Sequence, residues 1–184
     1  MPQHQLTRRR FIQLSTAAVA AVSIGRPALS RVRRADKLRI AVVGTQNQAG
    51  WNLSQIESEQ IVAICDVDSD YLEQAGARYK EAKRFRDFRE MIAAPLDIDA
   101  VLVAAPDHIH APAAAMALRL GKHVYCEKPL AHTVEEARVL ATLAAEKNLA
   151  TQMGTQIHAY ANDRRVVELV RSGIIGVVRE VHVW

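Results

Sequence analysis

Short, almost continuously apolar runs alternate with longer stretches of helical periodicity from Lys37 onward. A run of about five apolar residues between polar ones is typical of a strand that is covered on both faces of its sheet. Strands that alternate with helices in this way predict an α/β fold with a parallel, doubly wound sheet and right-handed crossovers. The predicted strands cover residues 38–44, 60–66, 100–106, 122–126 and 149–153, and a weaker one lies near Phe85.

Polar residues and glycines mark the ends of the predicted helices. Thr133 and Glu136 have the spacing of a capping box, in which each side chain bonds the other's backbone N–H, and a long amphipathic stretch follows them. Glycines stand where two further helices should end. We expect these helices to span about 111–121 and 162–173.

The last segment, residues 177–184, alternates apolar and polar positions after a helix, as a half-exposed strand does. One strand cannot form a sheet by itself. We therefore expect it to begin a second domain that is missing from this sequence. The expected organisation is a signal peptide and linker over residues 1–34, a doubly wound domain over 35–155, and the start of a truncated α+β domain over 156–184.

Charge excludes one class of function. The chain has 24 basic and 20 acidic residues and a net charge of +4. The excess comes from four arginines within residues 1–30, so that the remaining chain holds 20 basic and 20 acidic groups. A chain with that balance has no basic surface for a phosphate backbone. We predict that it does not bind nucleic acid.

The N-terminal segment has the order of a signal peptide. The sequence TRRRFIQ precedes an apolar, Ala-rich run over residues 14–24, and RPALSR follows. Paired arginines before a short apolar run and small residues indicate the twin-arginine type. The run is shorter than the ~20 residues that span a membrane. We expect export to the periplasm or tethering on the outer side of the membrane, with no stable span after processing; a basic amphipathic helix is the alternative.

Two cysteines, Cys65 and Cys126, each close an apolar run, which is typical of a buried thiol. In the usual strand order 3-2-1-4-5, three strand spacings of about 14 Å in all separate them. A disulfide requires Cα atoms within about 7 Å of one another. We expect both cysteines to remain unpaired.

The turn after the first predicted strand, GTQNQAG, is a candidate phosphate-binding loop. In a dinucleotide-binding fold the pyrophosphate lies at this turn, where backbone N–H groups and the helix dipole meet its charge. The pattern G-x-G-x-x-G/A places Gly44, Gln46 and Ala49 at its fixed positions, so the middle glycine is absent. The phosphate must then lie further out, or the side chains of Asn47 and Gln48 must hold part of it.

Asp66 supports this interpretation, because it closes the second predicted strand about twenty residues further on. A carboxylate there accepts hydrogen bonds from the adenosine ribose and repels a 2′-phosphate, which favours NAD over NADP. The alternative is a solvated cap for a helix that begins near Ser69, a task that Asp68 could perform equally well.

Further polar residues follow the strands that end at Ala105 and Cys126. The carboxyl ends of parallel strands meet at one edge of the sheet, and ligands bind there at the topological switch point. His108 and His110 could suggest a metal pair, but no third ligand has suitable spacing. We predict no metal site.

Six motifs in order give the chain a resemblance to the Gfo/Idh/MocA oxidoreductase family, over about residues 38–184. Glu-Lys-Pro followed by a capped helix is the most specific of them. The resemblance implies an NAD-binding Rossmann domain over 35–155 and the start of a substrate and oligomerisation domain. The chain departs from the family at Gln46, which replaces a glycine, and at His158, where many relatives carry arginine. The motifs are GTQNQAG, ICDVD, APDHIH, EKPLAHTVEEA, MGTQIH and SGIIGVVREV.

By resemblance, Lys128 lies beside the nicotinamide and hydrogen-bonds the substrate oxygen that is oxidised. An ammonium there would stabilise the alkoxide that develops as hydride leaves carbon, or exchange its proton. Glu127 would orient the lysine or contact the nicotinamide ribose, and Pro129 would fix the turn. The alternative for the triplet is a surface salt bridge at the start of a helix.

The resemblance also implies which residues line the nicotinamide side of the cofactor. Gln156 is expected to approach it from the strand over 149–153. A water-facing position at a helix start is the alternative for His110, and His158 either touches substrate or only fills the place of the arginine. The other residues expected on this side are Ala105, Pro106 and Asp107.

The implied activity is NAD-dependent hydride transfer to or from a hydroxyl of a sugar or polyol, in a protein that forms homo-oligomers once the second domain is present. A catalytic partner would come from that second domain, which leaves open whether this chain catalyses anything unaided. Two alternatives stand beside it. One is an NAD-dependent glycoside hydrolase that oxidises its sugar transiently. The other is a non-catalytic NAD-binding remnant, which would be favoured by Gln46 in place of glycine and by the early end of the sequence.

Overall fold

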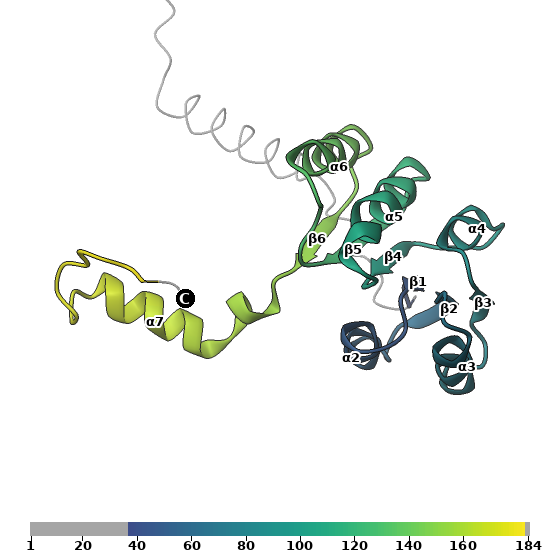
Figure 1. Cartoon of the computed structure of the whole chain (residues 1–184), viewed down its shortest axis with the longest axis horizontal. Coiled ribbons are helices and arrows are strands. Elements are labelled where there is room, and N and C mark those ends of the chain that lie inside the picture. The colour runs from purple at the N-terminus through teal and green to yellow at the C-terminus, as the bar shows by residue number, and fades with distance from the viewer. Residues whose placement is uncertain (1–36, 183–184) are drawn as a thin grey trace, which may run out of the picture. The chain divides into compact units, whose positions relative to one another are not determined.

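The computed structural model describes residues 37–182, and the predicted signal peptide lies outside this range. Six parallel strands form one sheet in the order β3-β2-β1-β4-β5-β6 (Figure 1). This order confirms the predicted α/β, doubly wound sheet, including the weak strand near Phe85. The strands are β1 (Arg39–Val43), β2 (Gln60–Cys65), β3 (Lys83–Phe85), β4 (Ala100–Val103), β5 (His123–Glu127) and β6 (Thr151–Gly154).

Helices cover both faces of the sheet. In Figure 1, α2 and α3 lie on one side and α4, α5 and α6 on the other. A 3-10 helix, η1, and a last α-helix follow β6. The helices are α2 (Gln48–Gln55), α3 (Ser69–Arg78), α4 (Phe88–Ala93), α5 (Asp107–Arg119), α6 (Val134–Glu146), η1 (Gln156–Ala159) and α7 (Ala161–Arg171).

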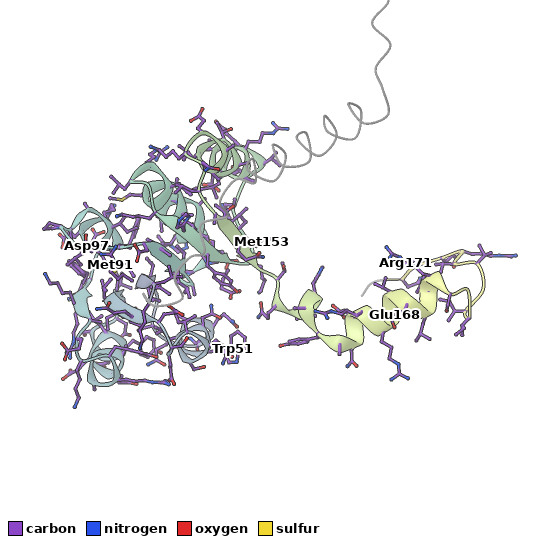
Figure 2. All side chains as sticks on the ribbon, turned by 180° about the vertical axis from the view of Figure 1, so that it is seen from behind. Trp51, Met91, Asp97, Met153, Glu168 and Arg171 are labelled. Atoms are coloured by element: carbon purple, nitrogen blue, oxygen red, sulfur yellow. The ribbon has the colours of Figure 1, made fainter. Side chains whose placement is uncertain are left out.

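The continuous apolar pattern of β1 is explained by this double cover. Successive side chains of a strand point to opposite faces. Val42 packs with Leu53 of α2 in one buried cluster, while Val43 packs with Met91 of α4 in the other. Met91 is fully buried, whereas Trp51 lies on the exposed side of α2 (Figure 2). Both faces of the strand must therefore be apolar.

The predicted helix signals are found in the structure. Thr133 and Glu136 form a reciprocal capping box at the start of α6, with bonds of 3.1 and 3.2 Å. Gly121 and Gly173 follow α5 and α7 with φ angles of 75° each. α5, however, begins at Asp107, earlier than the expected start near 111, and accommodates Pro112 in its interior. A carboxylate in the first turn is favoured there by the helix dipole.

Cys65 and Cys126 lie on β2 and β5, with β1 and β4 between them, and both are buried and free, as predicted. The expected strand over 177–184 is wrong within the described range, because residues 177–182 form no strand. A strand requires a hydrogen-bonded neighbour, and an alternating pattern alone does not supply one. No helix within residues 37–182 has the length and apolarity that a membrane crossing requires.

Candidate functional site

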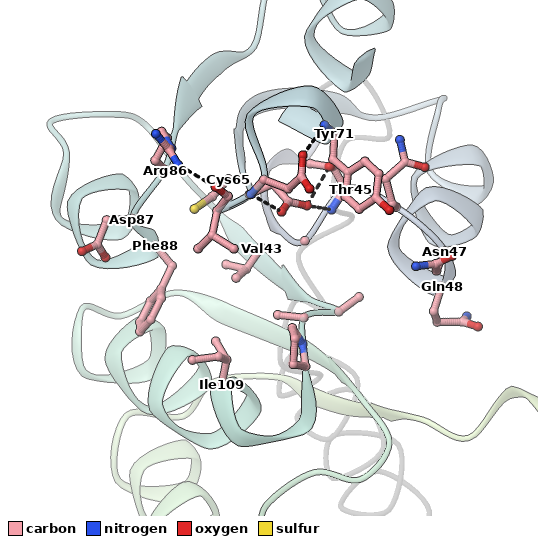
Figure 3. Close-up of a pocket in the computed structure, with 18 of the residues that line it drawn as sticks. Val43, Thr45, Asn47, Gln48, Cys65, Tyr71, Arg86, Asp87, Phe88 and Ile109 are labelled. Atoms are coloured by element: carbon pink, nitrogen blue, oxygen red, sulfur yellow. Dashed lines mark hydrogen bonds between the residues drawn. The ribbon is translucent and has the colours of Figure 1, made fainter. Parts of the chain in front are cut away.

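A pocket of about 710 Å³ opens at the carboxyl edge of the sheet (Figure 3). The ends of β1, β2 and β4 form its floor, and the loop before α2 forms one wall. In the order β2-β1-β4 the chain reverses its direction of winding, so the pocket lies at the topological switch point. Its lining includes these residues predicted from sequence: Gly44, Gln46, Asn47, Gln48, Asp66, Ala105 and Pro106.

Gly44 makes the loop after β1 possible. Its φ angle is 91°, and its N–H donates a 2.8 Å hydrogen bond to the carbonyl oxygen of Cys65. Asn47, at the N-cap of α2, has φ 53° and ψ −118°, a conformation that side-chain-bearing residues rarely adopt. Its side chain makes no capping hydrogen bond. Ala49 N–H donates to Gln46 O at 3.1 Å, so that in the first turn of α2 the N–H groups of Gln48 and Gly50 are the ones with no backbone partner within residues 37–182.

The side chains of Gln46, which replaces the missing glycine, and of Gln48 bond to other residues of the domain. Gln46 donates through Nε2 to the Oε1 of Gln74 on α3, at 3.2 Å. Gln48 donates to Asn52 at 3.1 Å and to Glu127 at 3.4 Å. The amide groups of Gln46 and Gln48 thus have protein partners. Contact of these side chains with phosphate stays a prediction.

Asp66 follows β2 and is half-buried. Its Oδ2 accepts hydrogen bonds from the backbone N–H of Thr45 at 2.9 Å and from Thr45 Oγ1 at 2.8 Å, and its Oδ1 accepts from Asp68 N at 3.1 Å. The cap of α3 is Asp68, whose side chain accepts from the N–H groups of Asp70 and Tyr71. Asp66 is therefore a pocket residue that also ties down the glycine loop.

His110 is buried, with 1% of its surface exposed, so the water-facing alternative is excluded. Its two ring nitrogens each lie 2.7 Å from a backbone carbonyl oxygen, one of Ala105 and one of Pro129. His110 therefore connects the end of β4 to the turn that carries Lys128. His108, rather than His110, lines the pocket. Contact of His110 and Asp107 with a cofactor stays a prediction.

Glu127 ends β5 and is buried, with 3% exposed. Its Oε1 accepts from Asn52 Nδ2 at 2.9 Å and from the Tyr125 hydroxyl at 3.2 Å. Burial and the neighbouring Glu127 carboxylate raise the pKa of Tyr125, which keeps its hydroxyl proton available as a donor. The alternative interpretation, a surface salt bridge, is not found within residues 37–182, where Glu127 bonds to neutral groups in the interior.

Lys128 follows Glu127 directly and is exposed at the same sheet edge. The Lys128–Pro129 peptide bond is cis. Neither Glu127 nor Lys128 takes part in an ion pair within residues 37–182. The Lys128 ammonium thus has no acidic partner in the part of the chain that the structure describes.

Gln156 lies in η1 rather than on the strand from which it was expected to approach. β6 ends at Gly154, two residues earlier, and the chain then tightens into a 3-10 turn that also contains His158. His158 is exposed. The cofactor contact of Gln156 stays a prediction.

The residues of the site that sequence reasoning missed include Thr45, Asn52 and Tyr125, together with Tyr71 and Arg86 of the pocket lining. Two of them had a usable signal. Tyr125 precedes Glu127 by two residues and so shares its face of the strand, and Asn52 follows Gln48 by four residues on one face of α2. No group of three His, Cys, Asp or Glu residues within 37–182 is arranged to hold a metal ion.

A glycine loop, an acid after β2 and a pocket at the switch point define a dinucleotide-binding domain. A profile of an oxidoreductase family with an NAD-binding Rossmann fold matches residues 38–155. The chain belongs to this family, the Gfo/Idh/MocA oxidoreductases.

Curated relatives and solved structures agree with this assignment. The chain is 33% identical to an uncharacterized oxidoreductase of Rhizobium meliloti over 79% of its length and 45% of the relative's. It is 30% identical to a glycosyl hydrolase family 109 protein of Solibacter usitatus, over 76% of the chain and 35% of that protein. It resembles the scyllo-inositol dehydrogenase of Lactobacillus casei, solved with NAD(H) and scyllo-inositol, with a TM-score of 0.68 and 27% identity over 77% of this chain and 43% of that one. The chain spans less than half the length of these proteins.

Proposed function

We propose that the chain is the cofactor-binding part of an NAD-dependent oxidoreductase that moves hydride between the nicotinamide and a hydroxyl-bearing carbon of a sugar or polyol. One observation carries this proposal. The glycine turn after β1, the Asp66 carboxylate after β2 and Lys128 after β5 all stand at the carboxyl edge of a single parallel sheet. The similarity to a polyol dehydrogenase solved with NAD(H) supports the substrate class.

The residues present fit NAD. The pocket beside Gly44 offers open backbone N–H groups for a pyrophosphate, and Asp66 offers carboxylate oxygens for an adenosine ribose while repelling a 2′-phosphate. NAD, when bound, supplies the hydride acceptor or donor.

Lys128 would act on the substrate oxygen. As hydride leaves the carbon of an alcohol, negative charge develops on that oxygen, and an ammonium within hydrogen-bond distance stabilises the charge. In the reverse direction the same group donates a hydrogen bond to the carbonyl oxygen that gains charge. Lys128 is exposed and unpaired toward this edge, while His110 and Glu127 fix the backbone on either side of it.

Calorimetric titration of the full chain with NAD and NADP tests the binding step. We expect NAD to bind and NADP to bind at least tenfold more weakly, because the 2′-phosphate meets Asp66. Lys128→Ala should retain NAD affinity within about twofold and lose turnover of sugars and polyols wherever the wild type shows it. Failure of the chain to bind NAD at millimolar concentration would overturn the proposal.

A second candidate is an NAD-dependent glycoside hydrolase, which the similarity to a family 109 glycosyl hydrolase favours. Such an enzyme oxidises its sugar transiently, eliminates the aglycone, adds water across the double bond that this leaves, and returns the hydride. Aryl glycosides distinguish the two: the hydrolase releases the aryl alcohol with no net NADH, whereas the dehydrogenase forms one NADH for each free sugar oxidised. Binding of NAD with neither activity would identify a non-catalytic remnant.

We also propose that residues 1–34 direct export by the twin-arginine route to the outer side of the membrane, on the strength of the TRRRFIQ sequence and the short apolar run after it. Fractionation of cells expressing the full chain tests this. Lysine in place of both Arg8 and Arg9 should retain the protein in the cytoplasm, while Arg26→Lys should not. Equal distribution of the two variants would contradict export by this route.

A substrate domain beginning at about residue 156 is the remaining part of the proposal. It is supported by the chain's span of less than half of its relatives' length. We propose that this domain supplies the catalytic partner of Lys128 and the contacts of a homo-oligomer. Light scattering on protein that contains such a domain should give one molar mass that is two or more times that of the protomer. A molar mass equal to that of one protomer would contradict the homo-oligomer.

A further inference from the structure

Arg86 follows β3 directly and lines the pocket next to the segment that begins at Asp66. The N–H of Asp66 donates to the carbonyl oxygen of Phe85 at 3.2 Å, which continues the pairing of β2 with β3 by one residue. The Nη2 of Arg86 donates to the carbonyl oxygen of Val67 at 2.9 Å (Figure 3). The guanidinium is therefore held beside the residue that follows Asp66, at the edge of the pocket.

Of the two arginines that line the pocket, Arg86 and Arg89, only Arg86 lacks an acidic partner within residues 37–182. Arg89 donates to both carboxylate oxygens of Asp87, at 2.7 to 3.1 Å. A guanidinium carries five N–H donors in one plane, and Arg86 uses one of them for Val67. Because Arg86 is exposed, the rest of its planar group can meet a ligand in the pocket.

The order of the strands indicates which part of a dinucleotide Arg86 would meet. Gly44, Asp66 and Arg86 directly follow β1, β2 and β3, which are neighbours in the sheet. Adjacent strands lie about 4.8 Å apart. In the proposed function the loop at Gly44 receives the pyrophosphate and Asp66 the adenosine ribose. The next group of the cofactor in the same direction is the base, so the base would lie beside Arg86.

The wall across the pocket from Arg86 is apolar. Phe88 of α4 and Ile109 of α5 lie there (Figure 3), and Val43 and Cys65 belong to the same lining. A flat aromatic base fits between a guanidinium plane and an apolar wall. The cation attracts the π face of the base, and the apolar side chains lose contact with water when the base covers them. A phosphate or a sugar hydroxyl would gain nothing from such a wall.

We propose that Arg86 is a specificity-determining residue, whose guanidinium stacks on the adenine base of the dinucleotide and favours a purine over a pyrimidine. This inference rests on the proposed dinucleotide function and adds to it the side chain that recognises the base. A purine is favoured because its two fused rings cover more of the guanidinium and of the apolar wall than one ring does. Arg86 lies outside the six sequence motifs, after the shortest strand of the sheet.

Calorimetric titration of the full chain with ADP and UDP isolates the base, because the two ligands share the ribose and the diphosphate. Wild type should bind ADP about tenfold more tightly than UDP. Arg86→Met keeps an unbranched side chain but removes the guanidinium. It should weaken ADP and NAD about fivefold and UDP at most about twofold. Arg89→Met is the matched control: its guanidinium is engaged by Asp87, so all three affinities should stay unchanged.

Arg86→Lys separates the flat guanidinium from its charge. Lysine keeps the positive charge but presents a compact ammonium instead of a plane. We therefore expect it to weaken ADP about threefold and to leave UDP unchanged. A lysine variant with the ADP affinity of wild type would overturn the stacking. Because Arg86 is exposed, both of its variants should fold like wild type, which circular dichroism checks.

The failure of this inference can be told apart from the failure of the proposed function. Equal weakening of ADP and UDP in Arg86→Met would show that the side chain acts on the diphosphate that they share, and would overturn recognition of the base. No weakening of either ligand would do the same. A wild type that binds ADP and UDP equally would overturn this inference and leave a nucleotide site intact. A wild type that binds none of ADP, UDP and NAD would overturn the proposed function itself.

Discussion

A Cβ atom on Gly44 would stand 2.3 Å from the carbonyl oxygen of Ala104 and 2.9 Å from its carbonyl carbon. Gly44 and Ala104 directly follow β1 and β4, the neighbouring strands between which the winding of the sheet reverses. Both contacts are to backbone, and the N–H of Ala104 is itself bound to Val43 O at 2.9 Å. The close approach of the two strand ends therefore permits only glycine at the start of the loop.

Gly44→Ala should lower the free energy of unfolding by at least about 3 kcal/mol, because the φ angle of 91° and the overlap with Ala104 both oppose a side chain. Urea unfolding followed by circular dichroism measures this. Gly121→Ala is the matched control: its φ angle is 75°, but nothing lies within 4 Å of its Cβ position. It should cost only about 1 kcal/mol. An equal decrease in the free energy of unfolding in both variants would show that the overlap with Ala104 does not contribute to the cost at Gly44.

Thr45→Val should lower the free energy of unfolding by about 1 kcal/mol and should also lower the affinity for NAD. It removes the hydroxyl that donates to Asp66 without changing the shape of the side chain. Thr45 is buried, so water cannot replace the lost bond. Chemical unfolding and calorimetry on the same samples report both effects. Thr151→Val, at an exposed position of β6, should change neither. A Thr45 variant indistinguishable from that control would contradict the tethering of the loop.

Asp99 should make folding sensitive to acid. Hydrogen bonds from the Arg39 side chain, at 2.7 and 3.0 Å, lower the pKa of Asp99 to about 2. An unfolded aspartate has a pKa of about 3.9. The stabilisation is therefore complete above pH ~4 and is lost as pH falls toward 2. The free energy of unfolding should fall less steeply over this window in Asp99→Asn than in wild type, whereas Asp97→Asn, whose side chain is 88% exposed, should follow wild type.

Both thiols should be unreactive in the folded chain. Burial raises the pKa of Cys65 and of Cys126 to about 12, so that the reactive thiolate is scarce at pH 8. An aromatic disulfide reagent should label neither thiol within minutes at pH 8 and label two per chain in denaturant. Rapid labelling of native protein would show that one of the two strands opens readily.

The fold could be predicted because its main signals are local. β1 is apolar at every position that two covering layers require, and the Thr133–Glu136 spacing marks the start of α6. The pocket residues that were predicted follow a strand directly or lie in the loop after one, as Asp66 and Gln46 do. Asn52 was missed because a single amide within a helix resembles an exposed surface residue in the sequence. Only the strand that packs beside the helix shows that it is buried. The strand expected over 177–184 is not found in residues 177–182 for the opposite reason, since its pattern is local but its hydrogen bonds are not.

Asp66 has consequences for coenzyme engineering. Its carboxylate is both a wall of the pocket and the tether of the loop through Thr45. Replacing Asp66 with a neutral residue to admit NADP would also release the glycine loop, which must bind the pyrophosphate of that coenzyme. A redesign toward the phosphorylated form should therefore leave the tether in place and add a cation nearby, or rebuild the anchor at Thr45 in the same step.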